Sequence, residues 1–218
     1  MNKRNYQKEL DELLKKKSEK KPSLFLHCCC APCSSYVLEY LHPYFQITLF
    51  FYNPNITEEK EYKKRKEELK RYVSEIPFGK EIKMVDADYL PEKFWEVSRG
   101  LEQEPERGGR YEKCFQLRLS ETAKKAREGN YDYFCTTLSI SPHKNADLLM
   151  KIGEELAERF EICYLPSDFK KKNGYKRSIE LSREYDLYRQ DYCGCVFSQK
   201  QRRKEQENEK ENDKSISD

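Results

Sequence analysis

A group of four cysteines within six residues constrains this 218-residue chain more than any other feature of its sequence. The group comprises Cys28, Cys29, Cys30 and Cys33, and only His27 separates it from residues 24–26, an apolar run long enough for a buried strand. In nucleotide-binding α/β proteins the turn after such a strand is rich in glycine, which lets the backbone approach a phosphate. Thiols stand in place of those glycines, so the segment predicts a ligand site with soft-metal or redox chemistry.

Apolar and amphipathic segments alternate along the rest of the chain. Residues 36–41 predict a helix after the cysteines, with Ser34 and Ser35 as capping residues, and Thr57 can cap a later, highly charged helix. Four more apolar segments predict strands: residues 45–52, 81–85, 131–138 and 162–165. Helical spacing predicts helices near residues 6–14, 58–76, 91–97, 114–128, 148–160 and 178–188. This alternation predicts an α/β fold, a doubly wound and mostly parallel sheet of about five strands.

Composition divides the chain into three parts. Residues 1–22 predict a charged helical arm, residues 23–198 a catalytic α/β domain, and residues 199–218 a disordered polar tail or a frayed helix. The net charge of +3 comes from the N-terminal arm, so the central domain is nearly neutral. No run approaches the ~18 apolar residues of a membrane helix, and the first 21 residues are too charged for a signal peptide. We therefore expect a cytoplasmic protein without membrane contact.

Nine cysteines in a reducing compartment favour metal-binding or catalytic thiols over a disulfide framework. Besides the first group, Cys114 stands at the expected start of a helix, and Cys193 and Cys195 flank Gly194 after the last expected helix. The strand-to-helix turns of a parallel sheet meet at one edge, so these thiols are expected to converge. Cysteine thiolates hold iron–sulfur clusters and also select zinc, and the spacing does not separate the two.

The remaining cysteines and two histidines have a structural explanation. Cys135 and Cys163 lie inside expected strands and predict buried structural thiols. Cys28 is as well suited to the core as to the site. His27 and His143 favour structural roles over ligand roles.

Six ordered motifs across residues 23–198 resemble the QueH-type epoxyqueuosine reductases. The motifs are His27-Cys28-Cys29-Cys30-Ala31-Pro32-Cys33-Ser34, Tyr52-Asn53-Pro54-Asn55-Ile56, residues 100–106, Cys114-Phe115-Gln116-Leu117-Arg118-Leu119, residues 136–145, and Tyr188-Arg189-Gln190-Asp191-Tyr192-Cys193-Gly194-Cys195. The resemblance implies an iron–sulfur enzyme that catalyses the last step of queuosine synthesis in tRNA. Such enzymes deoxygenate the epoxide of epoxyqueuosine to a cyclopentene without cobalamin.

The resemblance also implies roles for individual cysteines. It places Cys29, Cys30 and Cys114 among the ligands of a [4Fe-4S] cluster. The family usually has Arg-Cys-x-x-Cys at the second ligand motif, whereas this chain has Tyr111 where the first of those cysteines is expected. The fourth ligand is therefore left open between Cys33, a late cysteine and a group other than cysteine.

The late motif implies the second redox element that a two-electron reduction requires. Cys193 and Cys195 resemble the family's redox-active thiols, or a site for an additional iron ion. Asp191 is a candidate proton donor, although capping or a solvated charge explains this residue better. The implied partners are tRNA carrying epoxyqueuosine and an unidentified electron donor. Basic clusters that are candidates for RNA contact are Lys63, Lys64 and Lys66, residues 170–172, and Lys176 with Arg177.

Two other classes of protein share part of this pattern. The expected sheet and the Asn-Pro-Asn-Ile turn resemble the PP-loop domains of ATP-dependent tRNA thiolation enzymes, which need a glycine-rich loop where Cys28, Cys29 and Cys30 stand. A zinc-stabilised RNA-binding module without catalytic activity is the other alternative, and metal analysis distinguishes it.

Overall fold

The computed structural model describes residues 4–16, 20–105 and 108–215, with side chains described as far as residue 209. Five strands form one parallel sheet in the order β3-β2-β1-β4-β5. The strands are β1 (Ser23–His27), β2 (Gln46–Phe51), β3 (Lys83–Asp86), β4 (Tyr133–Thr136) and β5 (Cys163–Tyr164). The predicted α/β class and parallel sheet are confirmed. None of the described helices is both long and apolar enough to cross a lipid bilayer.

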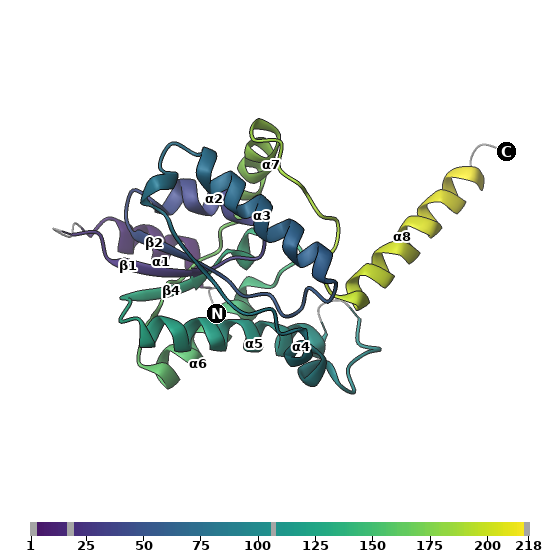
Figure 1. Cartoon of the computed structure of the whole chain (residues 1–218), viewed down its shortest axis with the longest axis horizontal. Helices are drawn as coiled ribbons and strands as arrows, with labels where there is room; N and C mark the ends of the chain where they lie inside the picture. Colours follow the sequence, from purple (N-terminus) through teal and green to yellow (C-terminus); the bar gives the residue numbers. More distant parts are fainter. Residues whose placement is uncertain (1–3, 17–19, 106–107, 216–218) are drawn as a thin grey trace.

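Helices cover both faces of this sheet (Figure 1). They are α1 (Tyr6–Leu14), α2 (Ala31–Leu41), α3 (Glu59–Glu75), α4 (Pro91–Ser98), α5 (Gly109–Glu128), α6 (Ala146–Phe160), α7 (Gly174–Glu184) and α8 (Val196–Ser215). Side chains of β1 alternate between two cores: Leu24 and Leu26 pack in the core of α2 and α3, whereas Phe25 packs in the core of α5 and α6. Because both faces are buried, β1 is apolar throughout its middle.

The strand order places a topological switch point between β1 and β4. From β1 the chain continues through α2 to β2 on one side, whereas β4 follows α5 on the other side of the sheet. Doubly wound folds bind ligands in the crevice at the carboxyl ends of the strands that flank such a point. The cysteine group at residues 28–33 leaves β1 at this edge.

The helix after the first cysteines begins five residues earlier than predicted. Cys30 is the N-cap, in an extended conformation, and its sulfur accepts a hydrogen bond from Cys33 N. Pro32 in the first turn suits this start because its fixed φ is already helical. Ser34 and Ser35 lie inside the helix, where their hydroxyls donate to backbone carbonyls, so the prediction that they cap it was wrong.

Two further helix starts differ from the prediction. Thr57 does not cap α3; its hydroxyl instead accepts a hydrogen bond from Val196 N at the start of α8. Helix α5 begins at Gly109, whose amide donates to the Glu104 carboxylate, so Cys114 lies in the second turn and does not open the helix.

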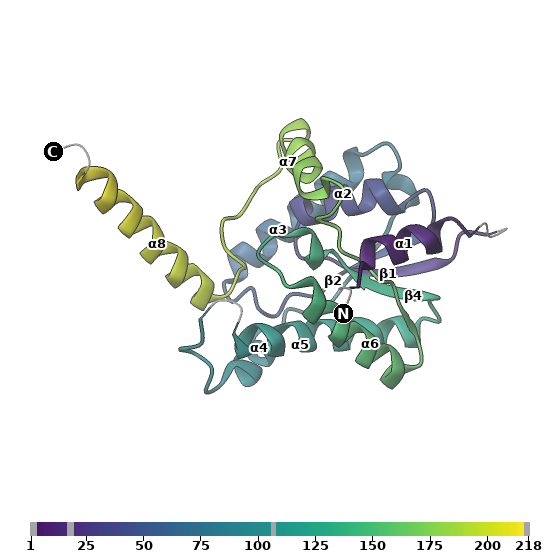
Figure 2. The same ribbon diagram turned by 180° about the vertical axis from the view of Figure 1, so that it is seen from behind.

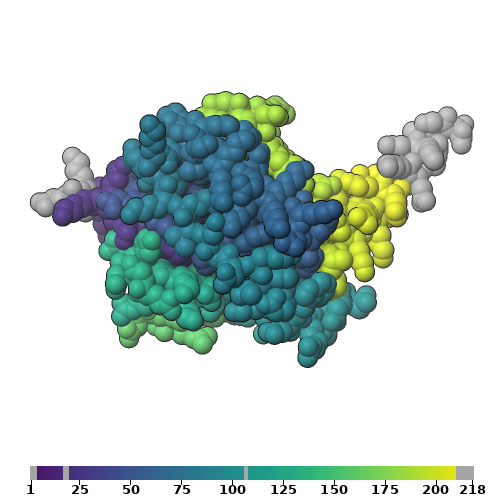
Figure 3. Space-filling view, viewed as in Figure 1, coloured from purple at the N-terminus to yellow at the C-terminus, as the bar shows by residue number. Residues whose placement is uncertain are grey.

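Residues 199–215 form most of α8, where the sequence predicted disorder or a frayed helix; residues 216–218 lie outside the described part. The helix stands away from the body of the molecule (Figures 1, 2 and 3). Its first turn is anchored by Phe197, which packs against Phe94 and Trp95. Farther along, pairs such as Gln201–Glu205 and Arg202–Glu205 support a helix without an apolar stripe. The three-part domain division stays a prediction.

The two cysteines predicted to be buried in strands have different environments. Cys135 in β4 is fully buried, and its thiol lies 3.5 Å from the Ser167 hydroxyl. Cys163 is exposed, so its predicted burial was wrong. It begins the two-residue edge strand β5, on the side that no further strand covers in the described sheet.

Candidate metal centre and substrate cavity

The strand β1 ends in a turn that directs neighbouring cysteines differently. Cys28 is fully buried in the core, and its thiol donates to the Phe50 carbonyl at 3.4 Å. Of the two alternatives left open by the sequence, Cys28 therefore occupies the core. Asn53 fixes the same turn, because its side-chain amide donates to the Cys28 carbonyl at 2.9 Å.

His27 holds this turn to two neighbouring strands. Its Nε2 lies 3.0 Å from the Tyr52 carbonyl and its Nδ1 2.9 Å from the Thr136 hydroxyl. A carbonyl only accepts, so Nε2 carries the hydrogen and Nδ1 accepts from Thr136. Burial lowers the pKa of His27 to about 3, which keeps the ring neutral. These contacts match the structural role that the sequence favours for His27.

Three cysteines of the first group come together at the edge of the sheet. The sulfur atoms of Cys29, Cys30 and Cys33 all lie within 4.8 Å of one another. Within the described part of the chain, this is the group of three potential ligands that geometry identifies as able to hold a metal ion. Because Cys30 is the helix N-cap and Cys33 lies one turn later, the start of α2 itself brings the thiols together.

One of these three thiols ionises more readily than the others. Burial opposes ionisation of Cys30, but hydrogen bonds from the thiols of Cys29 and Cys33 and the charge of Arg65 outweigh it, so the pKa of Cys30 is well below its ordinary value. The hydrogen bond to Cys30 raises the pKa of Cys29 to about 11. Contacts with its two neighbours also raise the pKa of Cys33. Cys30 is thus the most readily ionised of the three thiols, and metal binding would release the protons that the group still carries.

A second set of thiols lies next to the first. Cys114 from α5 and the late cysteines Cys193 and Cys195 line a small apolar cavity. Burial raises the pKa of Cys114 to about 11 and also raises that of Cys195. Cys193 differs, because Lys144 Nζ lies 3.2 Å from its sulfur. Burial opposes its ionisation, but the charges of Lys144 and Arg118 lower its pKa below the ordinary value.

Arg118 lies between the two sets of thiols. It lines the small apolar cavity and also a larger cavity beside it. Its side chain is 1% exposed, its Nε donates to the Cys114 carbonyl, and its Nη2 has no hydrogen-bond partner. No carboxylate in the described residues forms an ion pair with it. A buried charge without a partner is costly, so this guanidinium requires thiolates or an anionic ligand beside it. Arg118 belongs to one of the six sequence motifs, but no role is predicted for it from the sequence. The signal for such a role is a cationic residue one helical turn after Cys114.

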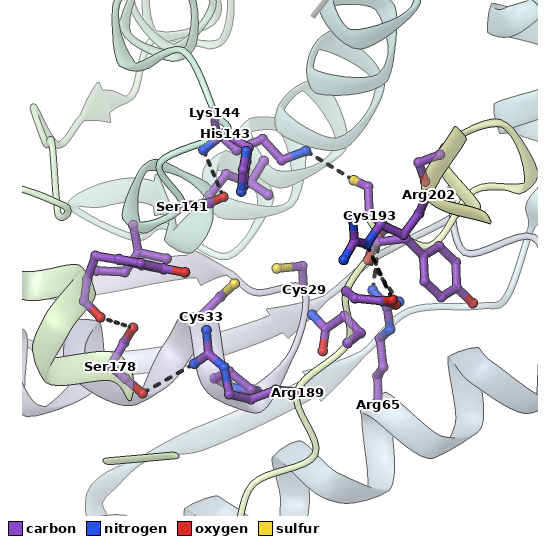
Figure 4. A pocket seen from close by; sticks show the side chains of 18 of the residues that line it. Cys29, Cys33, Arg65, Ser141, His143, Lys144, Ser178, Arg189, Cys193 and Arg202 are labelled. Carbon is purple, nitrogen blue, oxygen red and sulfur yellow. Dashed lines mark hydrogen bonds and ion pairs between the residues drawn. The ribbon is translucent and has the colours of Figure 1, made fainter. Parts of the chain in front are cut away.

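A larger cavity of about 490 Å³ opens beside these thiols. Figure 4 shows Cys29 and Cys33 on one side of it and Cys193 with Lys144 on another. The wall is completed by residues 189–193 and by one face of α8, Ser198, Gln201, Arg202 and Glu205. Cavities of this size hold drug-sized ligands.

The remaining site residues predicted from sequence lie at the cavity or near it. Asp191 is at the outer edge, 56% exposed at its side chain, and accepts a hydrogen bond from Gln206. His143 also lines the cavity. Tyr111 is buried at the position where a cysteine was expected, and Lys144 Nζ lies 4.3 Å from its ring centroid. The side-chain oxygen of Asn55, Oδ1, is buried without a hydrogen-bond partner, and Asn55 lines the smaller cavity.

The fold and this site define a doubly wound α/β protein with a cysteine-rich site able to bind a metal at its switch point. The family model described as epoxyqueuosine reductase QueH matches residues 24–201. Relatives of that name include a Streptococcus pyogenes serotype M1 protein, 45% identical over 90% of this chain and 78% of the relative, and a Thermotoga maritima protein, 32% identical over 83% and 92%. A Staphylococcus epidermidis relative is 42% identical over 89% and 84%. The chain therefore belongs to the QueH family of epoxyqueuosine reductases, which are oxidoreductases of queuosine biosynthesis.

Proposed function

We propose that this protein reduces the epoxide of epoxyqueuosine in tRNA to give queuosine, without cobalamin, using a [4Fe-4S] cluster and a second redox element. The observation that carries the proposal is the convergence of Cys29, Cys30 and Cys33 beside a cavity that also reaches Cys193. A thiol donor set suits an iron–sulfur cluster, and the unpaired charge of Arg118 suits an anionic group there.

We assign the three converging thiols and Cys114 as the cluster ligands. Cys33 then fills the position that Tyr111 leaves vacant relative to the family pattern. The donor chemistry fits, because all four groups are buried or half-buried thiols and the charge of Arg118 acts on two of them, Cys29 and Cys114. When bound, such a cluster supplies electrons one at a time.

Cys193 and Cys195 can supply the electron pair that the reaction requires. Oxidation of the two thiols to a disulfide releases two electrons and two protons. Reduction of the epoxide to an alkene and water consumes the same two electrons and two protons. The electron donor, acting through the site, then reduces the disulfide. An additional iron ion held by the same two sulfurs is the other form of this second element. In either form, the low pKa of Cys193 favours the thiolate that both kinds of chemistry use.

Lys144 is better placed than Asp191 to deliver a proton to the leaving oxygen. Its ammonium group lies at the cavity wall beside Cys193. Asp191 is exposed at the outer edge and is engaged by Gln206 and Arg202. We therefore assign proton delivery to Lys144 and a peripheral role to Asp191.

Metal analysis and turnover together test this function. Protein purified without oxygen should be brown, contain four or more irons per chain with matching sulfide, and convert epoxyqueuosine in tRNA to a product lacking one oxygen, as read by mass spectrometry of nucleosides. Cys30→Ala should lose the chromophore and the conversion, because Cys30 is one of the three converging thiols. Cys135→Ala and Cys163→Ala are the matched controls and should keep both. Stoichiometric zinc without iron or sulfide would contradict the proposal and favour a zinc module.

The distribution of ion pairs narrows the basic clusters that can contact RNA. Lys63, Lys66 and Arg177 form ion pairs with Glu59, Asp86 and Glu39 at 2.7, 2.9 and 2.7 Å. Lys170 pairs with Asp168 and Lys172 with Asp11. In the described residues, Lys64, Lys171 and Lys176 of these clusters have no ion-pair partner, and neither does Arg189, which lines the cavity. Lys64 Nζ lies 3.4 Å from the ring centroid of Tyr188, next to Arg189 at the cavity.

We therefore propose that Lys64 and Arg189 contact phosphates of the tRNA around the cavity opening. Lys64→Gln and Arg189→Gln should each weaken tRNA binding and reduce the slope of log K against log salt by roughly 1. Lys63→Gln is the control, since the same helix carries it but Glu59 already neutralises it. Titrations at several salt concentrations measure the slope. If all three variants kept the slope of the wild type, the RNA contacts would lie elsewhere, with the N-terminal arm as the alternative.

A further inference from the structure

The segment that carries Cys193 and Cys195 has no regular secondary structure of its own. It belongs to the connection between α7 and α8, and residues 189–193 form a wall of the large cavity. Its backbone is nevertheless fixed by residues that precede or form α3. Thr57 N donates to the Gly194 carbonyl at 3.2 Å, and the Asn55 side chain donates to the Cys193 carbonyl at 3.4 Å.

The strongest of these attachments comes from Arg65 on α3. Its Nη1 donates to the Cys193 carbonyl at 3.1 Å and its Nη2 to the Tyr192 carbonyl at 3.3 Å. Its Nε donates to the Glu61 carboxylate at 2.6 Å, one helical turn earlier. The guanidinium is 1% exposed, so these partners replace its hydration. A planar guanidinium binds two carbonyls and a carboxylate at once, which an ammonium group cannot match.

Glu61 and Gly194 complete this arrangement. Tyr188 donates its hydroxyl hydrogen to the Glu61 carboxylate at 3.1 Å, so the same ion pair also holds the beginning of the segment. Gly194 has a φ of +117°, and a Cβ there would lie 2.9 Å from the Ile56 side chain and 3.2 Å from Arg65 Nη1. The turn formed by residues 193–195, called the thiol turn below, therefore lies directly against the guanidinium, at a distance that requires glycine.

We propose that Arg65 is the positioning residue for the Cys193–Cys195 pair: its buried ion pair with Glu61 fastens the thiol turn to α3 and so keeps Cys193 at the cavity wall and Cys195 enclosed. The physical reason is that a buried guanidinium is stable only when all its partners are present, so the turn and the ion pair order each other. The catalytic meaning of this fastening rests on the proposed function, whereas the fastening itself does not.

Thiol labelling under mildly reducing, oxygen-free conditions tests the fastening in the cluster-containing protein. Arg65→Lys keeps a positive charge but loses the double contact with the two carbonyls. We expect the labelling rate of Cys195, which is 4% exposed, to rise by about tenfold or more, read by peptide mass spectrometry. Cys135, in the core, should label as slowly as in the wild type, which shows that the fold is intact. Glu61→Gln should raise the Cys195 rate in the same direction.

Arg71→Lys is the matched control. Arg71 also lies on α3, pairs with Glu68 and Glu75, and donates to the carbonyls of Tyr185 and Asp186 in the same connection, but before the thiol turn. Arg71→Lys should leave the labelling rate of Cys195 unchanged.

Steady-state kinetics give a second reading of Arg65→Lys. The variant should lower kcat by about tenfold with little change in KM for tRNA, because the substitution displaces thiols and not the RNA contacts. A Cys195 labelling rate equal to that of the wild type, or one that rises in step with Cys135, would overturn the proposal. If the wild type failed to convert epoxyqueuosine, the proposed function would fall and the labelling result would still stand.

Discussion

Replacement of both Cys193 and Cys195 with serine should abolish conversion of epoxyqueuosine to queuosine while the iron–sulfur chromophore remains. The two thiols lie on a connection separate from the start of α2, where Cys29, Cys30 and Cys33 converge. Their loss removes the second redox element but none of the ligands assigned to the cluster. The measurement is a dithionite-reduced single-turnover assay, in which the product has one oxygen fewer by mass spectrometry. Binding of tRNA should be retained.

The controls for this variant separate three explanations. Cys163→Ser alters an exposed thiol on the edge strand β5, outside both cavities, and this variant should convert epoxyqueuosine normally. Near-normal conversion by the double variant would show that the pair is dispensable and would move the second role to another thiol. Loss of the chromophore would instead make Cys193 or Cys195 a cluster ligand, in place of Cys33 or Cys114.

Arg118→Met should produce the second large effect. We expect the affinity of the protein for its bound iron to fall by about two orders of magnitude or more. Arg118 is buried between both sets of thiols, and no described carboxylate pairs with it. Its removal leaves the negative charge of thiolates and bound metal group uncompensated in a buried site, a change worth about 3–5 kcal/mol. Iron retained per chain after a chelator challenge measures the effect, and Arg118→Lys should retain more iron than Arg118→Met.

The stability of the metal-free protein distinguishes this role from a structural one. Without metal, Arg118→Met removes a buried charge that has an unpaired Nη2, so the free energy of unfolding should stay equal or rise. A large fall in that free energy, with iron binding unchanged, would show that Arg118 supports the fold and not the site. Urea titration of both forms provides the measurement.

Residues close in sequence determined most of the secondary structure of this protein. The apolar run before the cysteines predicted β1, and the alternation of strands and helices predicted a parallel sheet, because burial on both faces leaves a readable pattern in each strand. The motif at residues 27–34 also indicated soft-ligand chemistry through its thiols alone. Helix starts were less accurate: Cys30 caps α2 where Ser34 was expected, since a sulfur acceptor and Pro32 were not recognised as a start signal.

Tertiary structure alone decided how the thiols divide. Local pattern does not reveal that Cys28 points into the core, that Cys163 is exposed on an edge strand, or that Cys114 lies with the late cysteines. These outcomes depend on which strand is central, which is at the edge, and which face each helix covers. The same holds for Arg65 and Arg118, because a buried arginine is indistinguishable from a solvated one until its partners are brought together from distant parts of the chain. Local pattern determines the elements, whereas the long-range order of the sheet determines which side chains meet at its edge.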